Sequence, residues 1–468
     1  MVSEHHSKEP ETDLSHGSDA SDSGDPVKLQ EAPLWRKCMI VFSTSWITMS
    51  ACFSSTLFLS TVNELTQEFD VPRRTFEIAN AAVLLAFGMS SLVWTPIEKV
   101  CGRPIAYNCC IVALLVLTII AVFLSNSAGF IAVRILSGFQ GTYFHVAAQT
   151  IFADYFPPTQ RGTATGFFLA GVVLGSPLGP LVGAVIVTYK SWRVILWLQT
   201  AMVAFGLVLS VTFIQHGHGK PQRPTGRRSF CRTACLFNPL HVLKWWRYPN
   251  ILTTSVACGF LSWAQFSLLA VPRHVIEKRF QLHTPILSGL FYLAPTSGFV
   301  VGTILGGRLS DRTVKWWVKR RNGLRLPEDR LRSGVVSFFI VIPAAYLGFG
   351  WGIQCDECSR ARLAAPIVTA FFVGVGVFDA MTGLNTYCSE ALPKARRDVI
   401  ASKYFIQYTF SAVASAVATS LIDAVGLGPA CTIDVVFVLV SATLTASVAR
   451  RGSAMQRWAE GNSNRNLE

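Results

Sequence analysis

The sequence predicts an all-α membrane protein with twelve transmembrane helices in two six-helix, pseudo-symmetric bundles. Three observations support this prediction. The chain of 468 residues is 51% hydrophobic and 15% charged, which is too apolar for a soluble protein of this length. The apolar residues come in blocks of about 20, the length that crosses a bilayer as a helix. A polar motif also recurs at equivalent positions in the two halves of the chain.

Twelve apolar blocks follow one another along the chain. They cover residues 38–61, 75–97, 104–125, 128–152, 163–188, 192–214, 249–271, 285–309, 334–353, 363–388, 398–422 and 427–450. A long basic segment separates the first six from the last six. We therefore expect a disordered tail, an N-terminal bundle, a connector, a C-terminal bundle and a second tail at residues 1–37, 38–214, 215–248, 249–450 and 451–468.

Basic side chains indicate the orientation in the lipid bilayer. Of the 41 Lys and Arg, 30 fall on the side that holds both tails and the connector, so both termini are expected in the cytoplasm. A basic run such as "RTVKWWVKRRNGLR" between two spans indicates a cytoplasmic anchor beside anionic lipid. The asymmetric loops explain the net charge of +14, so we expect no nucleic-acid partner. No organelle signal is visible, and we expect a multi-pass monomer in the plasma membrane.

The twelve cysteines do not form the pattern of a secreted disulfide framework. Cys231 and Cys235 lack further ligands at zinc spacing, so the sequence predicts no metal and no cofactor. Cys355 and Cys358 fall in a loop on the non-cytoplasmic side, where they either remain reduced or form a local disulfide. No cluster of nucleophilic or metal-binding residues indicates an enzyme.

The internal repeat lies at the ends of the fourth and tenth blocks. The chain reads "DYFPPTQR" at the first position and "EALPKARR" at the second. Both have the pattern acid-x-x-Pro-x-x-x-Arg, with Asp154 and Glu390 as the acids and Arg161 and Arg397 as the arginines. The repetition favours duplicated halves, which are typical of alternating-access transporters.

A second pair of loops carries a resemblance to a known family. The loop after the eighth block reads "GGRLSDRTVKWW", with Gly307, Asp311 and Arg312, and the loop after the second reads "WTPIEKVCGRP", with Gly102 and Arg103. They resemble the G-x-L-a-D-r-x-G-r-k signature of the major facilitator superfamily. The resemblance implies a transporter whose loops latch the two bundles together on the cytoplasmic side.

The first copy of this signature departs from the family pattern. Lys99 occupies the acidic position, and Glu98 lies beside it. Two arrangements therefore remain open: either Glu98 replaces the missing acid in the latch, or the second copy alone holds the cytoplasmic side closed.

The fifth block, "GFFLAGVVLGSPLGPLVGAVI", is rich in helix-breaking residues. Its spacing resembles the G-x8-G-x3-G-P-x2-G-G motif of the twelve-helix drug:proton antiporter branch, with Ala184 in place of the last Gly. Small residues allow close helix approach in lipid, so we expect one small-residue surface facing helix two or eight, and a kink at Pro177 and Pro180. The motif positions are Gly166, Gly175, Gly179, Pro180 and Gly183.

The fourth block contains "RILSGFQGTYFHVAAQ", in which Arg134, Gly138, Gly141, His145 and Gln149 share one helical stripe. Its first part resembles the R-x3-G-x2-G motif of the same branch. An arginine within a span faces protein or a water-filled cavity, so it indicates either a substrate site or a buried structural ion pair. His145 is either a buried packing residue or, as its place on the stripe suggests, part of the cavity lining, and we assign Gln149 to the cavity as well.

Further candidates lie in the second half of the chain. Lys403 and Gln407 share one face of helix eleven, where the lysine either snorkels to the surface or binds substrate. Asp379 lies deep in helix ten and either carries a coupled proton or pairs with a buried cation. Gln265 and Asn385 are uncharged candidates for the substrate cavity.

The charges of these candidates favour a small organic anion as substrate. The buried cations outnumber the acids, and helix one has no acid, while its Ser and Thr hydroxyls suit an oxygen-rich small molecule. The segments "SWRVILWLQ" and "SGLFYLAP" resemble fungal exporters of the dicarboxylate itaconate, which implies itaconate efflux across a fungal plasma membrane. The alternative is a proton-coupled efflux pump for a fungal toxin or drug.

Overall fold

The protein is described by a computed structural model that covers residues 33–156, 158–214, 239–280, 285–355 and 364–465. These residues form helices and short connections, without a strand among them. Cys231, Cys235 and Cys358 lie outside the described residues, as does the side chain of Cys355, so the predictions for these cysteines stay predictions.

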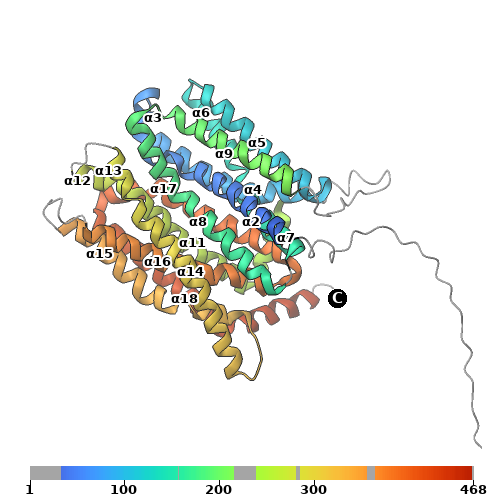
Figure 1. The fold of residues 1–468 in the computed structure, drawn as a ribbon. Helices are drawn as coiled ribbons and strands as arrows, with labels where there is room; N and C mark the ends of the chain where they lie inside the picture. Colours follow the sequence, from blue (N-terminus) through green and yellow to red (C-terminus); the bar gives the residue numbers. More distant parts are fainter. Residues whose placement is uncertain (1–32, 157, 215–238, 281–284, 356–363, 466–468) are drawn as a thin grey trace, which may run out of the picture.

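The first half of the chain supplies the first six spans (Figure 1). Its helices are α2 (Leu34–Thr56), α3 (Val62–Phe69), α4 (Arg73–Cys101), α5 (Arg103–Phe123), α6 (Ser127–Gly138), α7 (Gly141–Tyr155), α8 (Pro158–Tyr189) and α9 (Arg193–Phe213). A 3₁₀ turn at Leu57–Ser60 extends α2.

The second half supplies the other six spans and begins with a 3₁₀ helix at Pro239–Arg247. Its helices are α11 (Pro249–Val271), α12 (Glu277–Arg279), α13 (Pro285–Leu290), α14 (Leu293–Arg320), α15 (Ile342–Cys355), α16 (Ala364–Ala391), α17 (Arg396–Val425) and α18 (Leu427–Arg465). Shorter turns lie at Pro272–Ile276, Pro327–Arg332, Ser337–Val341 and Pro393–Ala395.

Ten helical segments of the described chain are long and apolar enough to cross a membrane. The two other predicted spans are interrupted. The fourth divides into α6 and α7 at Phe139 and Gln140, between two glycines of low helix propensity. The eighth divides into α13 and α14 at Phe291 and Tyr292, and the second half of α14 is rich in charged residues.

The predicted tails are partly helical. The tail predicted as disordered ended at residue 37, but α2 begins at Leu34. At the other end, α18 continues beyond the predicted span to Arg465. Both helices leave the membrane region on one side, which we call the termini side; the other is the far side.

Helix packing repeats between the two halves. Within the first six spans, α2 packs on α8, α4 on α6 and α7, and α5 on α9. The corresponding pairs of the second six are α11 with α17, α14 with α16, and α15 with α18. The two bundles meet where α4 contacts α17 and where α8 contacts α13 and α14 (Figure 1). This equivalence is the pseudo-symmetry that the repeated motif predicted.

The glycine surface of α8 faces α2 of its own bundle, so the prediction that this surface faces helix two or eight is wrong. The expected close approach of α8 to helix eight is present, but on another face of α8, which packs on α13 and α14. Gly175 lies against the backbone of Met49, Gly179 against Thr56, and Gly183 against Ser60, where an added Cβ would approach within 2.6 Å or less. Gly166 is different, since nothing lies within 4 Å of its Cβ position. It is therefore not part of the packing surface.

The contact of α2 with α8 also accommodates the predicted proline. Pro180 has no N–H to donate to the carbonyl of Ser176, one turn earlier. Thr56 of α2 donates its hydroxyl to that carbonyl at 2.6 Å. A side chain of a neighbouring helix thus satisfies the backbone group that proline leaves unpaired in the membrane. On the other face of α8, Ala184 lies against Gly289 of α13.

The glycines of the fourth span serve a second close contact. An added Cβ at Gly138 would meet the carbonyl oxygen of Val83 at 2.6 Å, and one at Gly141 would meet the ring of Phe87 at 2.0 Å. Both neighbours belong to α4. These glycines therefore bring α6 and α7 against α4, with Arg134 held one turn before them.

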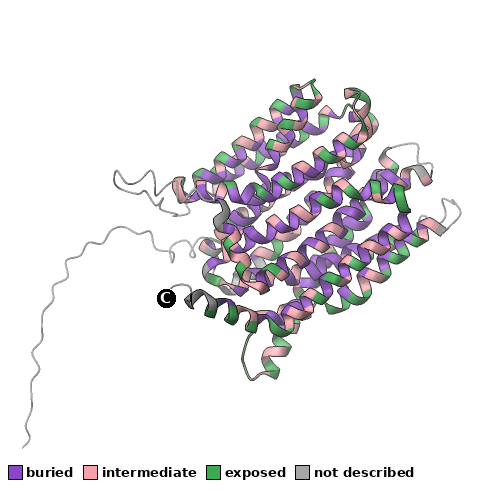
Figure 2. Ribbon diagram, turned by 180° about the vertical axis from the view of Figure 1, so that it is seen from behind, coloured by how far each residue is buried: buried purple, intermediate pink, exposed green. Residues whose placement is uncertain are grey.

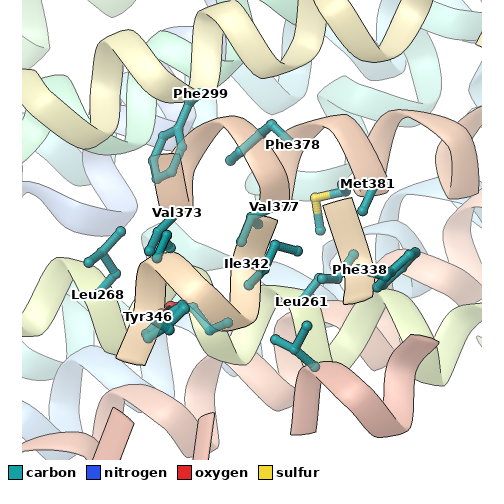
Figure 3. Packing of buried hydrophobic residues seen from close by; sticks show 14 of the residues in the cluster. Leu261, Leu268, Phe299, Phe338, Ile342, Tyr346, Val373, Val377, Phe378 and Met381 are labelled. Atoms are coloured by element: carbon teal, nitrogen blue, oxygen red, sulfur yellow. Dashed lines mark hydrogen bonds between the residues drawn. The ribbon is translucent and has the colours of Figure 1, made fainter. Parts of the chain in front are cut away.

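Buried and exposed residues divide as expected for a protein in lipid. Figure 2 shows buried residues where helices meet and exposed residues on outward faces. On α5, Val112, Val116, Ile120 and Phe123 are exposed along one stripe, which suits contact with acyl chains. Figure 3 shows the core of the second half, where Phe299 and Phe378 bring their ring centroids within 4.5 Å.

We predict that Gly175→Val destabilises the protein by about 1–3 kcal/mol, because the added side chain meets backbone atoms of α2 that cannot move alone. Gly166→Val is the matched control, since its site is open. Thermal unfolding of the purified protein in detergent measures both. Equal melting temperatures for the two variants would contradict the packing described for α8.

Candidate functional site

A cavity between the bundles opens toward the far side and contains Arg134, and we call it the Arg134 cavity. It encloses about 730 Å³ of empty space, part of it open to solvent. Both bundles contribute to its wall, through the 3₁₀ turn Leu57–Ser60, α3, α4 and α6 on one side and α11 and α17 on the other. Its polar lining residues are Arg73, Glu77, Asn80, Arg134, Ser415 and Thr419.

Arg134 is buried, with 5% of its surface exposed. Its guanidinium donates to the hydroxyl of Ser54 at 2.9 Å and to the carbonyl of the same residue at 2.5 Å. It also lies over the ring of Phe58, 4.6 Å from the centroid. Within the described part of the chain no carboxylate forms an ion pair with it, so its charge is held by neutral groups.

A second cavity between the bundles lies toward the termini side and contains Lys403. This Lys403 cavity encloses about 380 Å³ of empty space. It brings together three residues that the sequence placed on different helices, Gln149 of α7, Asn385 of α16 and Lys403 of α17. The remaining lining residues are Thr165, Leu169, Thr386, Cys388, Ser389, Ile400 and Tyr404.

Lys403 points into the protein and does not snorkel to the surface. It is 2% exposed. Its ammonium donates to Oδ1 of Asn385 at 2.6 Å and lies 3.4 Å from the ring centroid of Tyr404. No acidic side chain of the described ranges pairs with it.

An aromatic cluster of Phe87, His145, Tyr404 and Tyr408 lies between the two cavities. The rings of Phe87 and Tyr408 are 4.7 Å apart, and those of His145 and Tyr404 are 5.0 Å apart. Each pair joins one residue of the first bundle to one of the second. Along α17 the two tyrosines lie between Lys403 and the lining of the Arg134 cavity, so the cluster separates the two compartments.

His145 lies in this aromatic cluster and not in the substrate cavity where the stripe on the fourth span placed it. The residue is buried and its Nε2 lies 3.7 Å from the sulfur of Cys52, but it lines neither cavity. Gln265 and Gln407 are also buried and line neither cavity. Of the seven predicted substrate residues, the cavities therefore contain Arg134, Gln149, Asn385 and Lys403.

Asp379 lies inside the second bundle, away from both cavities. Its Oδ2 accepts a hydrogen bond from Ser337, and its backbone lies against Gly306 of α14. A second buried carboxylate, Asp434 of α18, accepts from Trp263 at 2.8 Å and from Ser267 at 2.7 Å. Asp434 stands within the predicted span 427–450, so the sequence offered a signal that our reading missed.

On the termini side, Glu98 connects the two bundles. Its side chain is 4% exposed, and Oε1 accepts from Arg103 at 3.1 Å and from Arg397 at 3.2 Å. Arg103 also pairs with Asp154. Because Glu98 belongs to α4 and Arg397 to α17, this ion pair spans the two bundles. Of the two arrangements left open by the sequence, the geometry agrees with the one in which Glu98 replaces the missing acid.

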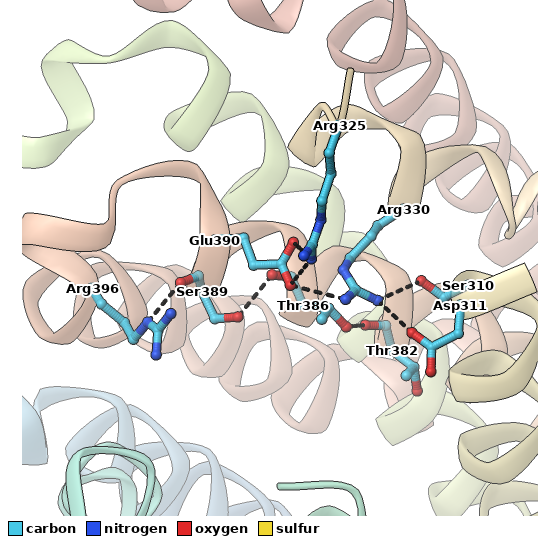
Figure 4. A network of polar contacts seen from close by, with 9 residues as sticks. All are labelled: Ser310, Asp311, Arg325, Arg330, Thr382, Thr386, Ser389, Glu390 and Arg396. Atoms are coloured by element: carbon cyan, nitrogen blue, oxygen red, sulfur yellow. Dashed lines mark hydrogen bonds and ion pairs between the residues drawn. The ribbon is translucent and has the colours of Figure 1, made fainter. Parts of the chain in front are cut away.

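The second copy of the loop signature forms a network within its own bundle (Figure 4). Arg330 binds Asp311 at 3.0 Å and Glu390 at 2.9 Å, and Arg325 binds Glu390 at 3.0 Å. All of these residues belong to the second half. Arg312 is exposed, and nothing lies within 4 Å of the Cβ position of Gly307, so neither is packed into this network.

Gly102 has the backbone conformation that its position requires. It ends α4 with a φ of 87°, in the region that glycine adopts readily. The turn places Arg103 at the start of α5, next to Glu98. The side chain of Arg161 in the repeated motif lies outside the described residues. In the described part of the chain, no group of three or more His, Cys, Asp or Glu could hold a metal ion.

Comparison with known proteins identifies the family. The family model described as Major Facilitator Superfamily matches residues 44–451. Efflux pump radE of Floropilus chiversii is 23% identical, covering 86% of this chain and 78% of its own. Multidrug transporter DTR1 of Candida glabrata is 24% identical, covering 80% and 76% respectively. The ascochitine biosynthesis cluster MFS transporter of Didymella fabae is 28% identical, covering 77% and 72%.

A solved structure has the same fold. The human organic anion transporter MFSD10 (TETRAN) superposes with a TM-score of 0.63, and the match covers 88% of this chain and all of that one. The two sequences are 16% identical. A likeness at this level shows the fold, with its twelve transmembrane helices in two bundles.

We predict that Glu98→Gln opens the termini side, because it removes the charge that holds Arg397. Cys388 lines the Lys403 cavity and reports the opening. In a variant that keeps only this cysteine, its reaction with a maleimide should accelerate about fivefold. This factor corresponds to a shift of about 1 kcal/mol in the equilibrium between the closed and open termini side.

Asp311→Asn is the matched control for this experiment. Its ion pair with Arg330 stays inside the second bundle, so the labelling rate of Cys388 should not change. If Glu98→Gln and Asp311→Asn gave the same rate, the contact of Glu98 with Arg397 would not be what closes the termini side.

Proposed function

The chain belongs to the Major Facilitator Superfamily, and on that premise we propose that this transporter exports a small organic anion by alternating access. The observation that carries the proposal is the pair of buried cations, Arg134 and Lys403, one in each cavity between the bundles. Membership in a transporter family agrees with the prediction that the chain is not an enzyme.

The surroundings of the two cations support an anionic substrate. A charge within the hydrocarbon region is unfavourable unless another charge or polar groups compensate it. Arg134 is compensated by one serine and an aromatic face, and Lys403 by one amide and an aromatic face. A substrate carboxylate would complete either site, whereas a cationic drug would be repelled by both.

Alternating access then moves the anion from one cation to the other. With the termini side in the cytoplasm, substrate reaches Lys403 when the contact of Glu98 with Arg397 separates. Closing that side and parting the rings of Phe87 and Tyr408 opens the way to Arg134. In this scheme Gln149 and Asn385 donate or accept hydrogen bonds at the first site.

The membrane potential supplies a driving force for export. Moving one elementary charge through 100 mV is worth about 2.3 kcal/mol, so a dianion gains about 4.6 kcal/mol on leaving a negative interior. Uniport would suffice, and proton antiport would add to the drive. We propose the plasma membrane as the location and a monomer as the working unit.

Within this class we propose itaconate as the substrate. It is a small dicarboxylate, and its two carboxylates suit a path with two successive cations. The resemblance to fungal itaconate exporters in the segments "SWRVILWLQ" and "SGLFYLAP" supports the choice.

A second candidate function is efflux of a fungal toxin or drug coupled to protons. The names of the relatives favour it, since they include an efflux pump, a multidrug transporter and a transporter of the ascochitine biosynthesis cluster. In this case Asp379 would be the proton carrier. Its unshared Oδ1, which has no partner among the described residues, is the observation that favours this role.

We predict that Arg134→Gln reduces anion export at least about tenfold with normal protein levels, because glutamine cannot compensate a carboxylate charge. Lys403→Gln should have the same effect. The matched controls are Arg308→Gln and Lys315→Gln, which remove exposed cations of α14. Efflux of labelled itaconate from loaded cells measures all four. Normal efflux in the Arg134 variant would overturn its assigned role.

Deleting the gene in an itaconate-producing fungus tests the substrate. We predict that itaconate falls outside the cells and accumulates inside, as measured by chromatography of both fractions. Unchanged itaconate in the deletion strain, together with a new sensitivity of that strain to a toxin, would favour the second candidate function. In that case the wild-type gene should restore resistance, and the Asp379→Asn variant should fail to restore it.

A further inference from the structure

The mouth of the Arg134 cavity has a charged pair that the scheme above does not use. Arg73, Glu77 and Asn80 lie on one face of α4, at steps of four and three residues, and all line the cavity. Ser415 and Thr419 of α17 line it from the opposite bundle. The substrate must pass these residues to reach the far side.

Glu77 is shared between its own helix and the other bundle. Its Oε1 accepts from Nε of Arg73 at 2.9 Å, and its Oε2 accepts from the hydroxyl of Thr419 at 3.0 Å. One turn away, Asn80 donates to Ser415 at 3.0 Å. These two hydrogen bonds, one between neutral side chains and one from a hydroxyl to a carboxylate, join α4 to α17 on the far side.

Helix stability does not explain the presence of Arg73. It is the first residue of α4, where a positive charge opposes the helix macrodipole. Arg73 also precedes Glu77 in their i,i+4 ion pair, and a base placed before its acid stabilises a helix less than the reverse order. A residue that is unfavourable for its own helix, and that faces a cavity with a buried cation, fits a role in binding an anion.

We propose that Arg73 is a second anion site of the Arg134 cavity, at which a substrate carboxylate displaces Glu77 before release. This inference rests on the proposed export of an organic anion. Besides Glu77, Arg73 donates through one terminal nitrogen to Oδ1 of Asn63 in α3 at 3.2 Å. The guanidinium has five N–H donors, so it can receive a carboxylate in a forked geometry while it gives up Glu77 and keeps Asn63. No covalent step is involved.

The exchange also links binding to opening. Once displaced from Arg73, the carboxylate of Glu77 lies beside a second carboxylate, and like charges at short distance repel. Its remaining partner is Thr419, across the interface between the bundles. Repulsion therefore acts on the contact that closes the far side, so the bound anion favours the state from which it leaves.

The test uses the full-length protein in proteoliposomes that exchange labelled itaconate. Unlabelled itaconate is added on one side of the membrane at a time, and the concentration that halves the exchange is measured for each side. Arg73→Gln should weaken inhibition from the far side about tenfold or more and leave the termini side unchanged. Arg73→Lys should be intermediate, because it keeps the charge and loses the fork. Glu77→Gln should strengthen far-side inhibition several-fold, because it removes the competing carboxylate.

Arg74→Gln is the matched control, since Arg74 is the next residue, is exposed, and lines neither cavity. If the wild-type protein exchanges itaconate, and far-side inhibition is the same in Arg73→Gln and Arg74→Gln, the second anion site is overturned while the proposed anion export stands. Equal weakening from both sides would also overturn the second anion site, since a structural defect acts on both. If the wild-type protein exchanges neither itaconate nor succinate, the proposed export of an organic anion fails as well.

Discussion

The two bundles are held together along the length of α4 and α17, which pack on each other across the interface. These two helices join the bundles at both ends, through Glu98 and Arg397 on the termini side and through Asn80 and Ser415 on the far side. Between the two ends, Phe87 of α4 meets Tyr408 of α17. Both helices line the Arg134 cavity, and α17 also lines the Lys403 cavity.

The two closures differ in chemistry. The termini side is held by an ion pair between the bundles, whose acid is almost fully buried. Among the described residues, the far side is held by hydrogen bonds without an ion pair between α4 and α17: Asn80 with Ser415, and the hydroxyl of Thr419 with the carboxylate of Glu77. When the termini side opens, Glu98 loses Arg397 but keeps Arg103 of its own bundle, so its buried charge retains a partner. The tight packing of α8 on α2 keeps the first bundle rigid while this happens, because its glycines leave no gap at the backbone.

Much of the fold could be predicted from the sequence because lipid restricts the options. Apolar length located the spans, and the small residues of the fifth and fourth spans correctly indicated close helix contacts. The partners of those contacts could not be predicted from spacing, because the spacing of small residues shows that a helix face is smooth but not which neighbour covers it; Gly175 and Gly183 face α2 and the turn that extends it. For the site, Lys403, Asn385 and Gln149 were found by residue type, but their common cavity depends on three helices that are distant in sequence. Glu77 was missed because one acid near the start of a span resembles an ordinary solvated end.

The most direct test of an anion path is the dependence of transport on membrane potential. Purified protein in proteoliposomes would take up labelled itaconate under potassium diffusion potentials of both signs. We expect uptake to increase when the interior is positive and to decrease when it is negative, because the transported species carries negative charge through a path lined by Arg134 and Lys403. Uptake that ignores the potential, or that increases when the interior is negative, would contradict the anion path.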